Sequence, residues 1–159
     1  MQGLKSILVI DLDVHQGNGT AEIFQDNPCV TTFDMFCDSN YPWRTRRTNT
    51  YDVPLPDDIT GVEYLALLRE KLRMLKRHQP QLIIFQAGVD TLAEDALGNL
   101  KLTRNDLSLR NNVVYSFALD LNVPMVITMG GGYSRPADAS VNAHADVYRA
   151  AAFRLAAAY

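Results

Sequence analysis

The chain has 159 residues, of which 47% are hydrophobic. This is enough to bury one ordinary core, and we expect a single domain over residues 1–159. The formal net charge of -3 argues against nucleic acid as a partner, because phosphate binding needs a surplus of Lys and Arg on one face. Two cysteines are too few for a disulfide framework, and the first residues fit neither a signal peptide nor a membrane span. We therefore expect a cytoplasmic protein without a membrane partner.

Apolar runs and amphipathic segments alternate along the chain. The apolar runs, rich in Ile and Val, predict buried strands at residues 6–13, 30–35, 81–86 and 123–129. Helical patterns predict helices at residues 18–26, 61–77, 104–121 and 137–159. Residues 41–58 carry three prolines and are expected to form a surface loop. This order predicts an α/β fold with a mainly parallel sheet and helices on both faces.

Chemically reactive side chains follow three of these strands. The first strand runs into Asp11, Asp13 and His15, and the third is followed by Asp90. The fourth is followed by three glycines and Tyr133. Because ligands of parallel sheets bind beyond the carboxyl ends of the strands, we expect these groups to meet at one edge.

Asp13, His15 and Asp90 form a candidate metal site. One residue separates Asp13 from His15, so in extended backbone both side chains point the same way. With Asp90 they would give three ligands and leave a fourth position for water, as in catalytic zinc sites. The alternative is that Asp13 caps the helix near residue 18 and His15 is an ordinary loop residue. The glycine run favours the metal site, because it would let the backbone approach a cation closely and present Tyr133 to a reacting carbonyl.

A second enzyme class begins with a similar motif. In haloacid-dehalogenase-type phosphatases an apolar strand leads into Asp-x-Asp, where the first Asp is a nucleophile and the second an acid or base near magnesium. Here these residues would be Asp11 and Asp13, with Asp57 and Asp58 downstream. This alternative does not explain the glycine run or Tyr133.

Three segments together resemble a known family. "DLDVHQGNGT", "QAGVDTLAEDALGNLKLT" and "MGGGYS" are similar, in this order, to motifs of the zinc-dependent histone deacetylases and their bacterial relatives, the acetoin-utilization proteins and acetylpolyamine amidohydrolases. Gln16 and Asn18 resemble the class IV type. The resemblance covers the C-terminal half of the family domain and implies that half of the arginase/deacetylase-like fold.

The resemblance also implies roles for individual residues. It implies zinc bound by Asp13, His15 and Asp90, and an amide carbonyl polarised by Tyr133. A potassium ion would be held by Asp11, with backbone oxygens and the side chain of Asp34. The acyl-lysine channel would be lined by the backbones of Gly88, Gly131 and Gly132. The implied reaction is hydrolysis of N-acetyl-lysine, or of a similar acetylated small molecule.

One family element is absent from the sequence. The family domain has an N-terminal portion with a tandem His-His pair that acts as general base and acid, whereas His78 and His144 here stand alone. His144 is expected on an ordinary helix face. General acid-base help is worth on the order of 100- to 10,000-fold in rate, so we expect a poor enzyme. The missing half should also expose apolar surface, which predicts a homo-oligomer or a complementing N-terminal half. The alternative function is an inactive, metal-binding oligomeric remnant or interaction module.

Overall fold

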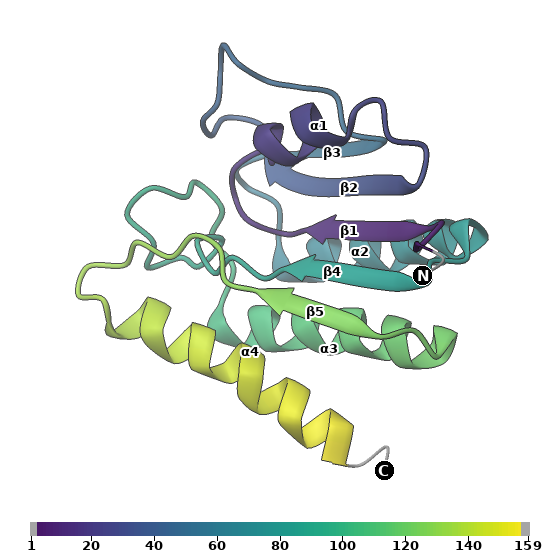
Figure 1. The fold of residues 1–159 in the computed structure, drawn as a ribbon. Helices are drawn as coiled ribbons and strands as arrows, with labels where there is room; N and C mark the ends of the chain where they lie inside the picture. Colours follow the sequence, from purple (N-terminus) through teal and green to yellow (C-terminus); the bar gives the residue numbers. More distant parts are fainter. Residues whose placement is uncertain (1–2, 157–159) are drawn as a thin grey trace.

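The computed structural model describes residues 3–156 and contains a five-stranded parallel sheet (Figure 1). The strand order is β3-β2-β1-β4-β5. The strands are β1 (Ile7–Asp11), β2 (Val30–Cys37), β3 (Tyr51–Leu55), β4 (Leu82–Gln86) and β5 (Met125–Thr128). All pairs of neighbouring strands are parallel, which confirms the predicted α/β fold class.

The central strand β1 is buried on both faces, as its continuous apolar run predicts. Leu8 and Ile10 are fully buried on one side, and Val9 is buried on the other. In the register with β2, Ile10 lies opposite Phe33 and Asp11 lies opposite Asp34. Two carboxylates therefore face each other at the point where the two strands leave the apolar core.

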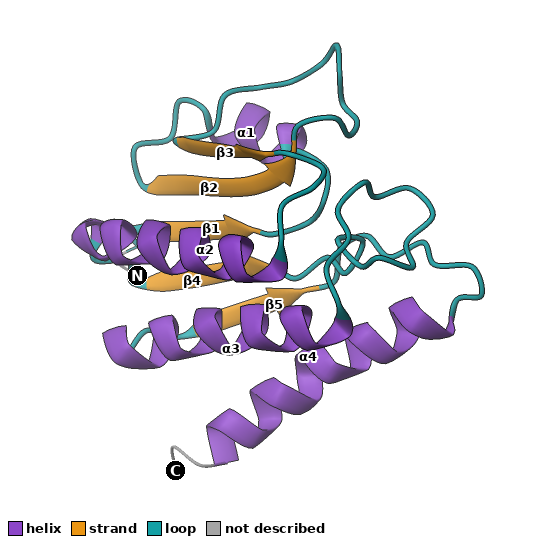
Figure 2. Cartoon of the chain, turned by 180° about the vertical axis from the view of Figure 1, so that it is seen from behind, coloured by secondary structure: helices purple, strands orange, loops and turns teal. Residues whose placement is uncertain are grey.

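Two long helices, α2 (Gly61–Leu75) and α3 (Arg104–Leu121), cover one face of the sheet. They lie side by side over this face, as Figure 2 shows. α2 continues into the short 3-10 helix η1 (Lys76–His78), and α1 (Asn18–Phe24) lies on the opposite face beside β2. Both long helices begin with a capping box, formed by Thr60 with Glu63 and by Thr103 with Asp106.

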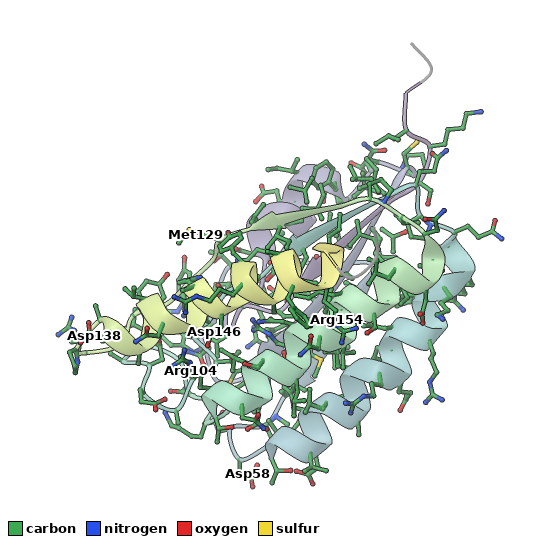
Figure 3. The ribbon with its side chains drawn as sticks, turned by 90° about the horizontal axis from the view of Figure 1, so that it is seen from below. Asp58, Arg104, Met129, Asp138, Asp146 and Arg154 are labelled. Atoms are coloured by element: carbon green, nitrogen blue, oxygen red, sulfur yellow. The ribbon has the colours of Figure 1, made fainter. Side chains whose placement is uncertain are left out.

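The last helix, α4 (Asp138–Ala156), packs against α3 beyond the β5 edge (Figure 3). Arg104 of α3 forms an ion pair with Asp146 of α4 at 2.6 Å, and the Tyr115 hydroxyl donates to the carbonyl oxygen of Val147 at 2.8 Å. The final residues of the helix predicted over 137–159 lie outside the described part of the chain. Among residues 3–156, no helix combines the length and apolarity that a membrane crossing requires.

The prediction of a surface loop over residues 41–58 was wrong in part. Residues Tyr51–Leu55 form β3, the edge strand next to β2. Its fourth residue is Pro54, which lacks an N–H group and is therefore tolerated in an edge strand. Pro54 also made this segment look irregular in the sequence, and the strand could not be told from a loop by composition alone.

Candidate functional site

The loops that follow β1, β4 and β5 gather at one end of the sheet, where the strand arrows point in Figure 1. They carry Asp13 and His15, Asp90, and the glycine run with Tyr133, respectively. The structure thus brings together the side chains that the sequence predicted to meet at this edge.

Asp13, His15 and Asp90 converge on one point. The Nδ1 atom of His15 lies 3.0 Å from Oδ1 of Asp13 and 3.0 Å from Oδ2 of Asp90. One donor atom from each residue lies within 4.8 Å of the other two. Asp90 is fully buried and Asp13 is 7% exposed, so both carboxylates are largely shielded from water. Two carboxylates and an imidazole at this separation fit a divalent cation that accepts nitrogen and oxygen ligands.

The pKa values of Asp13, His15 and Asp90 indicate a site that favours a positive charge. Hydrogen bonds to Asp13 and then to Asp90 raise the pKa of His15 to about 10, so a proton balances the carboxylates at neutral pH. Burial raises the pKa of Asp90 to about 6. Burial also acts to raise the pKa of Asp13, but hydrogen bonds from His15 and from other neighbours hold it below its ordinary value. A metal ion would have to displace the His15 proton, so its affinity should increase with pH.

A second pair of carboxylates lies behind the first site. Oδ1 of Asp11 accepts from the backbone N–H of Asp13 at 3.1 Å, and Oδ2 of Asp34 accepts from the N–H of Gly17 at 2.7 Å. Burial and then the charge of Asp13 raise the pKa of Asp11 to about 8. Burial and then the charge of Asp11 raise the pKa of Asp34 well above its ordinary value. Oδ1 of Asp34 is buried without a hydrogen-bond partner among the described residues, which leaves it available to a cation.

The glycines permit close approach of the backbone to these carboxylates. A Cβ atom at Gly131 would lie 1.9 Å from Oδ2 of Asp90, and one at Gly88 would lie 2.3 Å from Oδ2 of Asp13. Instead, the N–H of Gly131 donates to Oδ2 of Asp13 at 2.7 Å. Gly132 packs against Val89 and His144. No described glycine has a positive φ, so close approach rather than an unusual turn explains the glycine run.

Tyr133 lies at the wall of an open pocket that Asp13 and His15 also line. Its ring is edge-on to the His15 ring, with 6.2 Å between the centroids, and 45% of the residue is exposed. Burial and then the charge of Asp13 raise the pKa of Tyr133, so its hydroxyl keeps its proton at neutral pH. The pocket has a volume of about 600 Å³, and Asp13, His15, Gly131 and Tyr133 all line it. Its rim carries the exposed side chains of Tyr41, Trp43 and Leu97.

Two residues that the sequence interpretation missed hold this edge together. Arg110 of α3 is fully buried, and its Nη1 donates to the carbonyl oxygens of Leu12 at 3.1 Å and Gly88 at 2.7 Å. It thereby joins the loops after β1 and β4. Asp95 accepts from the N–H of Tyr133 at 2.6 Å and fixes the backbone of that residue. The one sequence signal for Arg110 is its place in the apolar stripe of α3.

His144 was expected on an ordinary helix face, but its ring lies under the glycine loop. A Cβ atom at Gly132 would lie 2.9 Å from its Nε2 atom, and its Nδ1 is buried without a partner among the described residues. Burial and then the charge of Arg110 lower its pKa, so it is neutral at pH 7. His78 is bonded through Nε2 to the Tyr51 hydroxyl at 2.9 Å. Among the described residues that line the pocket, His15 is the only histidine.

Comparisons with known proteins agree on one family. The histone deacetylase domain matches residues 1–148 of the chain. An uncharacterized protein of Picosynechococcus sp. is 41% identical over 146 residues, which are 91% of this chain and 48% of that protein. Histone deacetylase 2 of Arabidopsis thaliana is 37% identical over 135 residues, which are 83% of this chain and 35% of that protein. The chain therefore spans less than half the length of these relatives.

Solved structures show the same fold. A crystal structure of an HDAC homolog from Aquifex aeolicus has a TM-score of 0.79 at 26% identity, covering 92% of this chain and 41% of that one. Acetylpolyamine aminohydrolase from Burkholderia pseudomallei has a TM-score of 0.75 at 22% identity, covering 91% of this chain and 44% of that one. From the domain match and these relatives, the chain belongs to the histone deacetylase family.

Proposed function

We propose that the chain is the metal-binding part of a zinc-dependent deacetylase that hydrolyses N-acetyl-lysine or a similar acetylated small molecule. The observation that carries this proposal is the convergence of Asp13, His15 and Asp90 on one point, where Asp13 and His15 also line a pocket with Tyr133. Acyl transfer needs a cation or hydrogen-bond donor where negative charge develops on the carbonyl oxygen. This pocket offers a site for the cation and a phenol for the hydrogen bond.

Each residue has a chemical role in this proposal. Asp13, His15 and Asp90 would hold zinc, which when bound lowers the pKa of water and polarises a carbonyl. Tyr133 would donate its hydroxyl proton in a hydrogen bond to the carbonyl oxygen, and its raised pKa keeps that proton available. The N–H of Gly131 orients Asp13, and Asp95 orients the backbone of Tyr133. Gly88, Gly131 and Gly132 would form the backbone wall of the acyl channel.

We propose further that Asp11 and Asp34 bind a potassium ion. Both carboxylates are buried, and the resemblance to the family implies a monovalent cation beside Asp11. The unpartnered oxygen of Asp34 supports this assignment, since a buried carboxylate oxygen without a hydrogen bond is costly. A cation at this position would also reduce the repulsion between Asp11 and Asp13.

We propose that the chain alone hydrolyses poorly and acts as part of an assembly. Hydrolysis needs a general base beside the attacking water, but His78 is engaged by Tyr51 and His144 lies behind the glycine loop. The exposed apolar residues Val126 of β5, Met129 directly after it and Phe153 of α4 support self-association or a complementing N-terminal half.

The alternative function is an inactive, metal-binding oligomeric remnant or interaction module, which is favoured because neither His78 nor His144 is among the described residues that line the pocket. The phosphatase alternative has less support. A nucleophilic carboxylate must reach its substrate, whereas Asp11 is only 6% exposed and one of its oxygens accepts from the backbone of Asp13. Asp57 is engaged by the Ser39 hydroxyl at 2.5 Å.

The test is hydrolysis of an acetyl-lysine reporter by the purified chain, with and without added zinc. We expect slow, zinc-dependent turnover that a chelator abolishes and that Tyr133→Phe reduces by about 100-fold. Turnover in both controls would indicate a contaminant. A folded chain that binds zinc without turnover would support the inactive alternative, and magnesium-dependent hydrolysis of a phosphate ester would support the phosphatase.

A further inference from the structure

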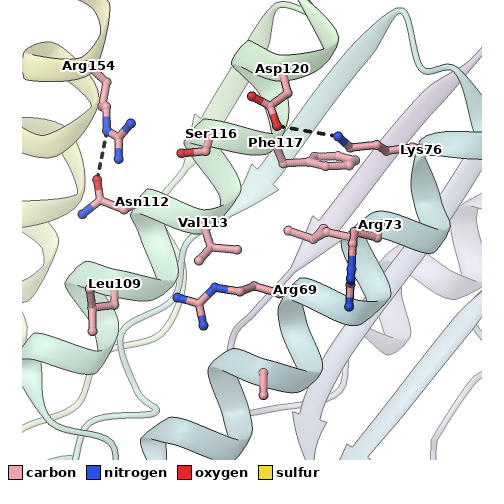
Figure 4. A pocket seen from close by; sticks show the side chains of 12 residues that line it. Arg69, Arg73, Lys76, Leu109, Asn112, Val113, Ser116, Phe117, Asp120 and Arg154 are labelled. Atoms are coloured by element: carbon pink, nitrogen blue, oxygen red, sulfur yellow. Dashed lines mark hydrogen bonds and ion pairs between the residues drawn. The ribbon is translucent and has the colours of Figure 1, made fainter.

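A second cavity lies on the outer surface of the helical layer, between α2 and α3 (Figure 4). It is a groove of about 750 Å³ and shares no described lining residue with the pocket that contains Asp13 and His15. The proposed deacetylase function makes no use of it.

The groove is strongly cationic although the chain as a whole is acidic. Its lining includes four basic side chains, Arg69, Arg73, Lys76 and Arg154, and one carboxylate, Asp120. In Figure 4, Lys76 is paired with Asp120, at 3.6 Å, and Arg154 donates to Asn112, at 3.2 Å. Arg69 and Arg73 have no acidic partner among the described residues. Two guanidinium groups therefore remain free to bind an anionic group.

The basic side chains form a line rather than a cluster. Arg69 and Arg73 of α2 and Lys76, where η1 continues α2, are spaced i, i+4 and i+7, so they lie along one stripe about 10 Å long. Arg69 extends from α2 toward α3 in Figure 4. An elongated ligand with several negative charges fits this stripe better than a compact ion does.

The floor of the groove is apolar, and its α3 wall combines apolar side chains with Asn112, Ser116 and Asp120. Leu72 and Phe117 are buried at its base, Val113 is partly buried, and Leu109 is 39% exposed on the α3 side. Small inorganic anions gain nothing from the apolar part of this surface. An amphipathic helix, in contrast, can place apolar side chains in a groove between two helices and its acidic side chains at the basic margin.

We propose that this groove binds an acidic, amphipathic segment of a partner protein. Carboxylates at the spacing of one helical stripe would pair with Arg69, Arg73 and Lys76, and apolar side chains of the same segment would contact Leu109, Val113 and Phe117. Such rim charges act mainly on the association rate and on its salt dependence.

The experiment measures binding of a fluorescein-labelled 15-residue peptide by fluorescence anisotropy. The peptide consists of Glu, Leu, Ala and Gln, with its glutamates and leucines on one helical face. We expect saturable binding that weakens as salt increases, and about tenfold weaker binding by the Arg69→Glu/Arg73→Glu variant. Lys71→Glu is the matched control, because Lys71 lies on the same helix but pairs with Glu70 outside the groove, and should change affinity less than twofold.

Two further arms make the outcome decisive. A peptide of the same composition with glutamates and leucines on opposite faces should bind at least about fivefold more weakly. Inorganic tripolyphosphate, used as a competitor, should displace the peptide no better than a simple salt does at the same ionic strength. Equal binding of both peptides, an unchanged affinity after the double charge reversal, or tight binding of tripolyphosphate would each overturn the proposal. Both arginines are exposed, and circular dichroism verifies the fold of each variant.

Discussion

In the proposed zinc site, each ligand residue contributes one donor atom. Asp90 shows this most clearly, because its two oxygens have different partners. Its Oδ2 faces His15, and its Oδ1 accepts from the N–H of Val14 at 2.9 Å. We expect Asp90→Ala to reduce zinc affinity by more than about 100-fold, because one of three protein ligands is lost. Isothermal titration calorimetry with zinc measures this change.

The control for this prediction separates binding from folding. Asp90→Asn keeps an oxygen for the Val14 amide and should lose zinc affinity while it remains folded. Asp26→Ala removes an exposed carboxylate away from the site and should leave affinity unchanged. Unaltered zinc stoichiometry and affinity in both Asp90 variants would contradict the assigned ligand set.

Asp11 allows a prediction about pH. Its folded-state pKa of about 8 lies above the ordinary value of 3.8, so the stability it contributes is present at acidic pH and is lost as pH rises toward 8. Asp11→Asn removes this titration and can still accept the Asp13 N–H. Without potassium or zinc, its free energy of unfolding should exceed that of the wild type by an amount that grows from pH 5 to pH 8, to on the order of a few kcal/mol.

Urea unfolding at several pH values measures this difference, with Asp26→Asn as the control. Potassium should stabilise the wild type more than sodium does, and Asp11→Asn should lose that preference. A pH-independent difference between variant and wild type would show that Asp11 carries its charge without cost in the folded state.

At the scale of elements, the sequence predicted best where local signals were strong. The bounds expected for α3, residues 104–121, agree with the structure because Thr103 begins the helix with a capping box and Asn122 ends it in the left-handed conformation. β3 was missed because Pro54 interrupts its apolar pattern. Arg110 was not recognised as buried despite its place in the apolar stripe of α3, since an arginine in an amphipathic helix usually faces water.

The cap of α3 gives a prediction for this scale. The Thr103 hydroxyl accepts from the N–H of Asp106 at 3.1 Å, and Asp106 accepts in return from the N–H of Thr103 at 2.9 Å. Thr103→Ala should lower the free energy of unfolding by about 1 kcal/mol. Thr103→Ser, which keeps the hydroxyl, should lower it much less. Urea denaturation midpoints of the two variants measure the difference, and equal midpoints would assign no stabilising role to the hydroxyl.

At the scale of the whole molecule, the two edges of the sheet differ. The β3 edge contains Pro54, whereas the β5 edge has Val126 at 49% exposure, followed by Met129 at 63%. Unprotected edges and apolar surfaces promote association. The general arrangement of sheet and site could be predicted because ligands of parallel sheets bind beyond the carboxyl ends of the strands. What covers the β5 edge could not be predicted, because an exposed apolar residue and a buried one have the same sequence pattern.

We therefore expect the purified chain to self-associate. The sedimentation coefficient should increase with concentration, and the Met129→Lys/Phe153→Lys variant should remain monomeric, since both residues are exposed near β5 or on α4. Ile23→Lys, an equally polar change on α1 at a residue that is 74% exposed, is the control and should not prevent association. A wild-type chain that is monomeric throughout the concentration range would contradict this expectation.

The buried Arg110 has a consequence for the order of folding. Its guanidinium reaches from α3 to the backbone after both β1 and β4, so the loops with Asp13 and Asp90 acquire their final positions only when this helix docks on the sheet. The metal site would then form after the folding transition state. A metal ion bound to such a late-forming site slows unfolding and leaves the folding rate almost unchanged. Zinc would thus slow the unfolding of the native chain without accelerating its folding.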